Sequence, residues 1–224
     1  MELSVSVTEN GGVEERSGAV NLHVDGDFLI EIPVKQSGLY MDMTESRFDF
    51  ESGAASRTVS MSTNLSFWNV LEKPSWVSVS PESGEAGEHT LTINVEDNPN
   101  TTKREGRVVV GNQGLSLADT LWVTQEGKSF GPLETVLQFE NVASSNTLDI
   151  STDGDWTVTT SDGWITVAPS SGHGNGQVTV TVEANETDNE RTGLLSVAVG
   201  GTVQYVNVVQ KGRYFTIDLS LIHI

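Results

Sequence analysis

The stretch that decides the fold is written twice: residues 164–172 read WITVAPSSG, and residues 76–84 read WVSVSPESG. The end of each copy also recurs. Residues 34–38 read VKQSG, residues 123–127 read VTQEG and residues 208–212 read VVQKG, which places the three glutamines 89 and 85 residues apart. A fixed period of this size is typical of a tandem array of structural modules.

Further positions keep the same register between copies. An asparagine recurs at Asn10, Asn98 and Asn185, and an arginine recurs at Arg16, Arg104 and Arg191. A tryptophan recurs at Trp68 and Trp156. Because an array must fill the same interior in every copy, a repeated residue is expected to be structural before it is expected to bind anything.

The register predicts the domain organisation. Residues 39–127 and 128–212 form two complete modules, and residues 1–38 form the C-terminal half of an earlier, truncated one. Residues 213–218 echo residues 39–43 and are expected to start a further truncated module. The terminal LSLIHI, residues 219–224, does not fit the repeat, and we interpret it as a sequencing-adapter artefact.

The hydrophobic pattern within a module is that of strands. In residues 178–182, Val-Thr-Val-Thr-Val alternates with a period of two, as a half-buried strand does. Gly200-Gly201 separates two such runs and suits a tight hairpin. The third copy has seven expected strands, at residues 135–141, 147–151, 155–160, 164–167, 177–183, 193–199 and 202–210. The sequence therefore predicts an all-β fold of tandem immunoglobulin-like antiparallel β-sandwiches with about seven strands each.

Composition excludes several classes of function. With 31 acidic and 12 basic residues, the formal net charge is −19, which disfavours nucleic acid and anionic polymers as partners. The chain has no cysteine, so it has no disulfide, thiolate metal site or cysteine nucleophile. No apolar run approaches the length of a membrane span, and no basic segment with an apolar core follows Met1 as a secretory signal. We expect no cofactor and a monomer that forms part of a longer chain.

The combined spacing resembles the BACON family, the Bacteroidetes-associated carbohydrate-binding, often N-terminal domains. The resemblance rests on Trp76–Gly84 with Arg104–Gly106 and Val123–Gly127, and on the same elements ending at Val208–Gly212. It implies immunoglobulin-like modules in secreted or cell-surface proteins of gut bacteria, often beside glycoside hydrolases or proteases, and it implies no catalytic residues. Glycan or glycoprotein binding and a spacer role are both implied.

The tryptophans divide into two groups. Trp68, Trp76, Trp156 and Trp164 recur at matched positions, and we expect them in the core. Trp122 does not recur: it corresponds to Asn207 in the next copy and to Pro33 in the preceding one. A position that accepts all three residue types is expected to face solvent.

An exposed aromatic ring on a strand suits stacking against a sugar. The predicted ligand-binding residues are therefore Trp122 and, on one strand face of the next module, Tyr205 and Asn207. The alternative is that these are solitary surface aromatics or contacts between modules.

Other chemistry finds little support. Two aspartates in Asp153-Gly154-Asp155 are far short of the six to eight oxygens that calcium takes, and a hairpin turn explains them better. No nucleophile elbow, phosphate loop or histidine metal motif is present. We expect no catalytic residue, no metal site and no enzyme activity. Two roles stay open: an accessory region that binds carbohydrate or glycoprotein, and a stalk that presents a catalytic or adhesive domain.

Overall fold

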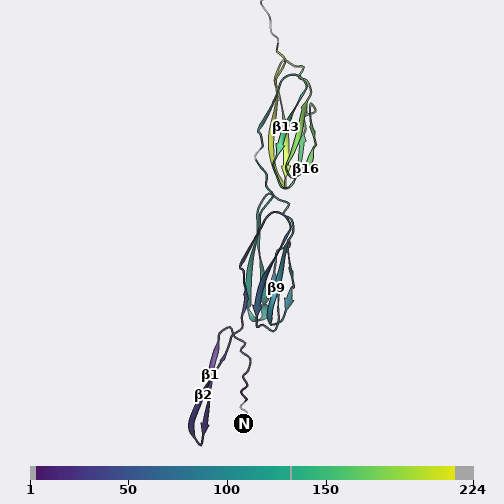
Figure 1. The fold of residues 1–224 in the computed structure, drawn as a ribbon. Helices are drawn as coiled ribbons and strands as arrows, with labels where there is room; N and C mark the ends of the chain where they lie inside the picture. Colours follow the sequence, from purple (N-terminus) through teal and green to yellow (C-terminus); the bar gives the residue numbers. More distant parts are fainter. Residues whose placement is uncertain (1–3, 132, 215–224) are drawn as a thin grey trace, which may run out of the picture. The chain divides into compact units, whose positions relative to one another are not determined.

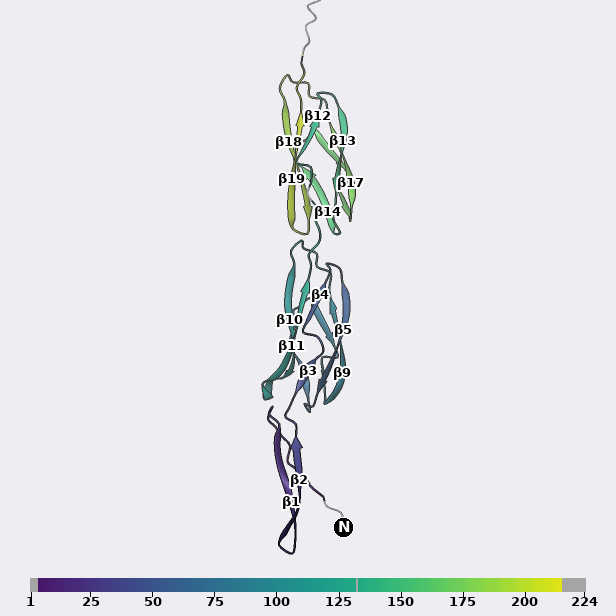
Figure 2. The same ribbon diagram turned by 60° about the vertical axis from the view of Figure 1, so that its left-hand side comes forward.

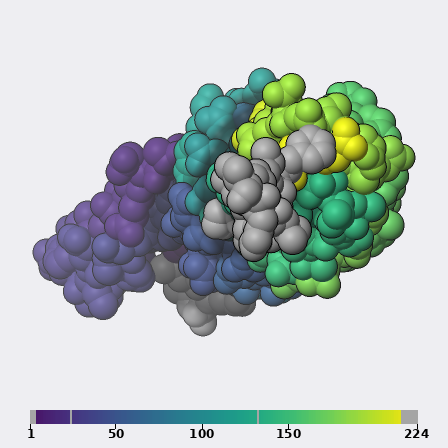
Figure 3. Space-filling model, turned by 90° about the horizontal axis from the view of Figure 1, so that it is seen from above, coloured from purple at the N-terminus to yellow at the C-terminus, as the bar shows by residue number. Residues whose placement is uncertain are grey.

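The computed structural model describes residues 4–131 and 133–214, and it is all β (Figures 1 and 2). Two separate hydrophobic cores form, one from residues between Met41 and Val123 and one from residues between Leu137 and Val208. Each predicted complete module thus encloses its own core, and the end points of the modules stay predictions. A space-filling view of the same chain is given in Figure 3.

The third module is a two-sheet sandwich. One sheet has the order β12-β19-β18-β14-β16 and the other the order β13-β17-β15. The strands are β12 (Val136–Phe139), β13 (Ser144–Ile150), β14 (Asp155–Thr160), β15 (Ile165–Ala168), β16 (Ser171–His173), β17 (Gly176–Val182), β18 (Arg191–Val199) and β19 (Thr202–Gln210).

The second module has two corresponding sheets, in the orders β4-β11-β10-β6-β8 and β3-β5-β9-β7, and β3 is an additional strand in the second of them. A short 3₁₀ turn, η1 (Gln113–Leu115), interrupts the last hairpin. The strands are β3 (Met41–Met43), β4 (Arg47–Phe50), β5 (Ala55–Thr63), β6 (Trp68–Glu72), β7 (Val77–Ser80), β8 (Ser83–Gly84), β9 (Gly87–Val95), β10 (Arg104–Asn112) and β11 (Leu117–Gln125).

The predicted fold class is confirmed, and the strand pattern explains it. Along β17, buried Val178, Val180 and Val182 alternate with outward threonines, as the period of two predicts. Two details differ from the prediction. The short β16 pairs with β14 and was too brief to show a period. The first strand β12 pairs parallel, not antiparallel, with the last strand β19, because the chain enters and leaves the module in the same direction.

The repeated polar residues form a buried hydrogen-bond cluster, which we call the hub. In the third module the Nε of Arg191 donates to the Oε1 of Gln210 at 2.8 Å. The Nε2 of fully buried Gln210 lies 2.9–3.3 Å from the carbonyl oxygens of Glu140, Val142 and Glu183. The amide of one glutamine therefore links the first strand to the end of β17.

The hub recurs in the other copies. Arg104 donates to Gln125 at 2.9 Å, and Arg16 donates to Gln36 at 2.7 Å. The repeated asparagine completes it, since the Nδ2 of Asn185 donates to the carbonyls of Asn189 and Lys211 at 2.8 and 3.0 Å. The repetition of these residues thus has a structural cause.

The four repeated tryptophans are not equally buried. Trp68 and Trp156 are enclosed in the cores, as expected, and each indole nitrogen donates to a carbonyl, of Glu85 and Gly174 respectively. Trp76 and Trp164 are only half-buried and cover the edges of the cores. An arginine packs on the exposed face of one of them: the guanidinium of Arg191 lies 4.1 Å from the ring centre of Trp164.

Residues 16–36 form a hairpin of β1 (Arg16–Val24) and β2 (Asp27–Gln36), which is purple to dark blue in Figure 2. Its turn, Asp25-Gly26, has positive φ at both residues, as a tight hairpin requires. By register it corresponds to β18 and β19 of the third module. The predicted start of a further module, residues 213–218, and the interpreted artefact, residues 219–224, lie outside the described residues apart from Arg213 and Tyr214.

Removing the central amide of the hub should destabilise one module. We expect Gln210→Leu to lower the free energy of unfolding of the third module by about 2–3 kcal/mol, because it removes the amide that bonds three backbone carbonyls and the guanidinium of Arg191. Hydrogen exchange of core amides, read separately in each module, measures this. Gln138→Leu, at an exposed position of β12, is the control, and equal effects of the two would contradict the role of the hub.

The glycine facing each buried tryptophan should be irreplaceable. A Cβ at Gly84 would lie 2.7 Å from the Cζ2 atom of Trp68, whereas a Cβ at Gly53 would meet nothing within 4 Å. We therefore expect Gly84→Ala to cost about 1–3 kcal/mol of unfolding free energy in the second module. Gly53→Ala should be close to neutral when both variants are compared by thermal denaturation.

Candidate ligand-binding surfaces

Trp122 lies where the sequence predicts it, on the outward face of β11. Its side chain is 48% exposed, while Leu121 and Val123 on either side of it are fully buried. Strand β11 is flanked by β4 and β10, and the backbone N–H of Trp122 donates to the carbonyl of Ser46 at 2.9 Å, just before β4. The indole is thus presented from the middle of a paired sheet rather than from a loop.

Ion pairs lie on the strands to both sides of Trp122. On β10 and β6, Arg107 donates two hydrogen bonds to the carboxylate of Glu72, at 2.9 and 2.7 Å. On β4, Arg47 donates to Asp49 at 2.9 Å and to the hydroxyl of Thr124 at 2.6 Å. We call Trp122, Arg107, Glu72, Arg47 and Asp49 the Trp122 surface.

The paired groups affect each other's ionisation. The hydrogen bond from Arg107 lowers the pKa of the Glu72 carboxyl below its ordinary value, and the same bond raises the pKa of Arg107. Both groups are therefore charged near neutral pH, and the carboxylate and guanidinium keep fixed, complementary directions. An aromatic face beside such groups can stack on a sugar ring and bond its hydroxyls.

Tyr205 and Asn207 occupy successive outward positions on β19. Tyr205 is 59% exposed and lies opposite Ser196 of β18, while Asn207 lies between Leu194 of β18 and Val136 of β12. Leu194 and Val136 are themselves exposed. The surface around Tyr205 is therefore more apolar than the Trp122 surface, and its polar neighbours in the register include the amide of Asn207 and the hydroxyl of Ser196.

The structure brings two of the three predicted residues together. Tyr205 and Asn207 share one strand face, whereas Trp122 belongs to the other module. The prediction did not include the ion pairs beside Trp122. The repeat could have found the pair with Arg107. It aligns Arg107 with Leu194 and Trp122 with Asn207 of the third module. Leu194 and Asn207 lie opposite each other in the hairpin of β18 and β19, so Arg107 is expected opposite Trp122.

The acidic turn at Asp153 has a local role. The Oδ1 of Asp153 accepts hydrogen bonds from the hydroxyl group of Ser129, at 2.8 Å, and from its backbone N–H, at 2.5 Å. Across residues 4–131 and 133–214, no group of three or more His, Asp or Glu side chains could hold a metal ion. Over the same residues, no helix has the length and apolar character needed to cross a membrane.

The two cores and their exposed sheet faces define tandem immunoglobulin-like β-sandwich modules. A family model described as "Viral BACON domain" matches residues 132–213, and one described as the BACON "Putative binding domain, N-terminal" matches residues 66–126. The two complete modules therefore belong to the BACON family, which confirms the resemblance.

Among known proteins, the chain is similar to the xyloglucan-specific endo-beta-1,4-glucanase BoGH5A of Bacteroides ovatus. The two are 32% identical over 78 residues, which are 35% of this chain and 16% of the enzyme. The solved structure of a Bacteroides ovatus GH5 xyloglucanase with a XXXG heptasaccharide matches at 30% identity and a TM-score of 0.36, over 39% of this chain and 19% of that one. The S-layer protein SbsC matches at 13% identity and a TM-score of 0.36, over 88% of this chain and 35% of that one. The chain thus spans less than a fifth of the glucanase.

The ionisation of Glu72 can be measured directly. Because Arg107 stabilises the charged carboxylate, the pKa of Glu72 should lie below its ordinary value of 4.5 in a carboxyl-detected NMR titration. Arg107→Gln should raise it toward that value. Arg47→Gln, which removes the partner of Asp49 instead, should leave the Glu72 titration unchanged.

Proposed function

We propose that this chain is a non-catalytic accessory region of a secreted or cell-surface bacterial protein, and that it binds carbohydrate or glycoprotein. The observation that carries the proposal is the Trp122 surface: an indole 48% exposed in the middle of a sheet, with fixed carboxylate and guanidinium groups on the neighbouring strands. An indole that stays exposed to water adds no stability to the fold, whereas an indole that stacks on a ligand is removed from water and stabilises the complex.

Tyr205 and Asn207 supply a second surface in the other module. Two weak sites on one chain would raise the overall affinity for a repeating glycan through multivalency. The acidic chain, with a net charge of −19, fits neutral glycans better than sulfated or sialylated ones. The similarity to a xyloglucan-specific glucanase makes neutral plant polysaccharides the first ligands to test.

The absence of enzyme activity belongs to the same proposal. Both family models match binding-type modules, and the similarity to the glucanase covers only 16% of that enzyme. A location outside the cell is inferred from the family, whose modules accompany secreted and surface carbohydrate-active proteins.

A spacer role is the second candidate, and one observation favours it. The outward position of Trp122 holds Asn207 in the third module and Pro33 in the N-terminal copy. A site selected in every copy would recur, as the hub does. A spacer would need only the repeated residues.

The deciding experiment is glycan binding by the whole chain. We expect saturable binding to xyloglucan or another neutral polysaccharide in affinity gel electrophoresis, and a loss of about ten-fold or more in affinity for Trp122→Ala. A smaller loss is expected for the double variant Tyr205→Ala, Asn207→Ala.

Phe67→Ala is the matched control, because Phe67 is 51% exposed but lies outside the sheet face of Trp122. It should bind like the unchanged chain. Absence of binding across neutral and mucin glycans, with every variant folded, would reject the binding role and leave the spacer.

A further inference from the structure

In the third module, the strand by which the chain enters is paired with the strand by which it leaves. The first strand β12 and the last strand β19 run parallel, in a register that extends from Val136 with Asn207 to Phe139 with Gln210 (Figure 2). Tension along the chain therefore pulls the two strands in opposite directions along their common axis. The strands can separate only by sliding, and sliding loads all the evenly spaced bonds of a parallel ladder together.

The last strand also holds the segment that precedes β12. The side-chain amide of Gln204, on β19, bonds this segment twice. Its Nε2 donates to the carbonyl of Gly131 at 3.0 Å, and its Oε1 accepts a hydrogen bond from the backbone N–H of Leu133 at 3.2 Å. One side chain thus extends the attachment beyond β12, toward the point where the chain enters the module.

At the other end of the ladder, each backbone carbonyl of residues 139–142 accepts a hydrogen bond. The backbone N–H of Lys211 donates to the first of them at 3.1 Å, and the backbone N–H of Asn185 donates to the third at 2.8 Å. The Nε2 of Gln210 donates to the second and the fourth, at 3.1 and 3.3 Å. The chain that leaves β12 is therefore fixed both to β19 and to the segment that follows β17.

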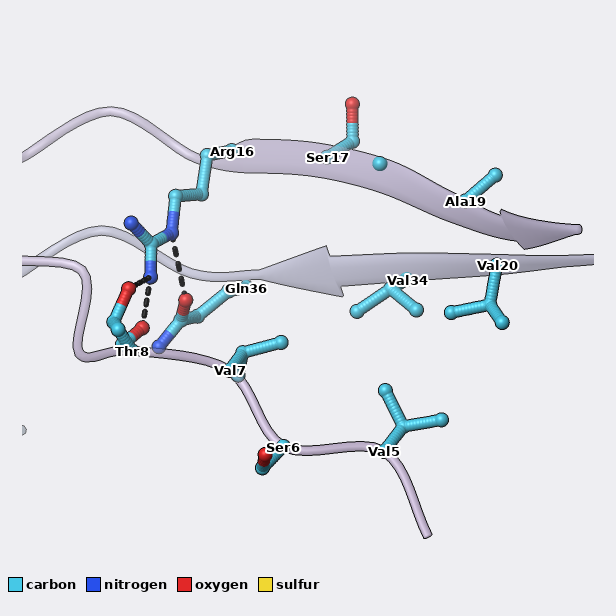
Figure 4. Close-up of a pocket in the computed structure, with 11 residues that line it drawn as sticks. Val5, Ser6, Val7, Thr8, Arg16, Ser17, Ala19, Val20, Val34 and Gln36 are labelled. Carbon is cyan, nitrogen blue, oxygen red and sulfur yellow. Dashed lines mark hydrogen bonds between the residues drawn. The ribbon is translucent and has the colours of Figure 1, made fainter. Parts of the chain in front are cut away.

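An arginine sets the direction of this glutamine. Because the Nε of Arg191 donates to the Oε1 of Gln210, the Nε2 of the same amide is directed toward the carbonyls. The same bond joins Arg16 to Gln36 at 2.7 Å, as Figure 4 shows. The arginine–glutamine bond therefore belongs to the repeat and is not a feature of one copy.

The second module has the same kind of attachment, made by different side chains. Asp119 of β11 aligns with Gln204, and its Oδ2 accepts a hydrogen bond from the backbone N–H of Met43, on β3, at 2.7 Å. Strands β4 and β11 are neighbours in one sheet, and Arg47 donates to the hydroxyl of Thr124 between them, at 2.6 Å. Side-chain bonds between the entering and the leaving strands thus recur although the residues change.

We propose that each complete module is a load-bearing element that stays folded under tension along the chain. In the third module the resisting part is the pairing of residues 131–142 with β19, together with the bonds of Gln204 and Gln210, and we call it the clamp. The clamp must break before the core can open, so it sets the rate of unfolding under force. Tension reaches the modules in both roles considered above, because a binding region and a spacer each join an anchored part of a chain to what the chain holds. The proposal therefore does not rest on glycan binding.

The first test changes only the direction of the load. Because the chain has no cysteine, two introduced cysteines give unique handles for magnetic tweezers on the whole chain. Glu134→Cys with Tyr214→Cys pulls the clamp in shear, whereas Glu134→Cys with Val203→Cys pulls both strands from the same end and opens the same bonds one at a time. All three positions are exposed. At equal force, we expect the third module to unfold about ten-fold or more slowly in the shear geometry.

The second test changes the clamp and keeps the shear geometry. Gln204→Leu should raise the unfolding rate at constant force about ten-fold or more, because it removes two bonds that are loaded together. Gln177→Leu is the matched control, since it removes a side-chain bond between β17 and β13, outside the clamp, and should leave the rate unchanged. Val180→Ala, in the core on β17, should lower the equilibrium stability in chemical denaturation and change the rate under force little.

Equal unfolding rates in the two geometries would overturn the proposal. So would a Gln204→Leu variant that unfolds no faster under shear than Gln177→Leu, or an acceleration as large for Val180→Ala as for Gln204→Leu. The comparison of geometries uses surface cysteines and an unaltered clamp, so it decides the question even if Gln204→Leu fails to fold.

Discussion

Each complete module depends on one buried glutamine. Gln210 and Gln125 are fully enclosed, and a buried amide is costly unless its donors and acceptor are all paired. Around Gln210 all of these groups are paired. Its Oε1 accepts a hydrogen bond from Arg191, and its Nε2 donates to the carbonyls of Glu140, after the first strand, and Glu183, after β17. The last strand, the first strand and the opposite sheet are thus fixed together at one point, which defines the register of all three.

This constraint explains which residues repeat and which vary. The hub, the buried tryptophans and the glycines that face them recur because a module cannot close without them. The outward positions are free to change, and there the modules differ. Trp122 stands beside two ion pairs, whereas Tyr205 stands near exposed Leu194 and Val136. The two faces have different chemistry, so a ligand that suits one need not suit the other.

The sequence was sufficient for the fold and for the exposure of Trp122, Tyr205 and Asn207. A period of two and a period of 85–89 residues are both local signals, and β14 and β19 begin and end where the pattern predicts. Other features depend on contacts across strands. The parallel pairing of β12, the half-burial of Trp164 under Arg191 and the pair of Arg107 with Glu72 required a register that the pattern does not give. Between β6 and β10 that register also shifts at Val109 and Val110.

The hub also shows where a module can be divided. Its asparagine, arginine and glutamine all lie after the strand equivalent to β16, so the second half of a module holds the side chains of the hub, and the first half contributes backbone carbonyls to it. Residues 1–38 correspond to this second half, and the arginine–glutamine bond forms there as well, between Arg16 and Gln36. Because backbone carbonyls are common to all sequences, the register of the strands, and not the identity of their side chains, decides which carbonyls reach the glutamine of the hub.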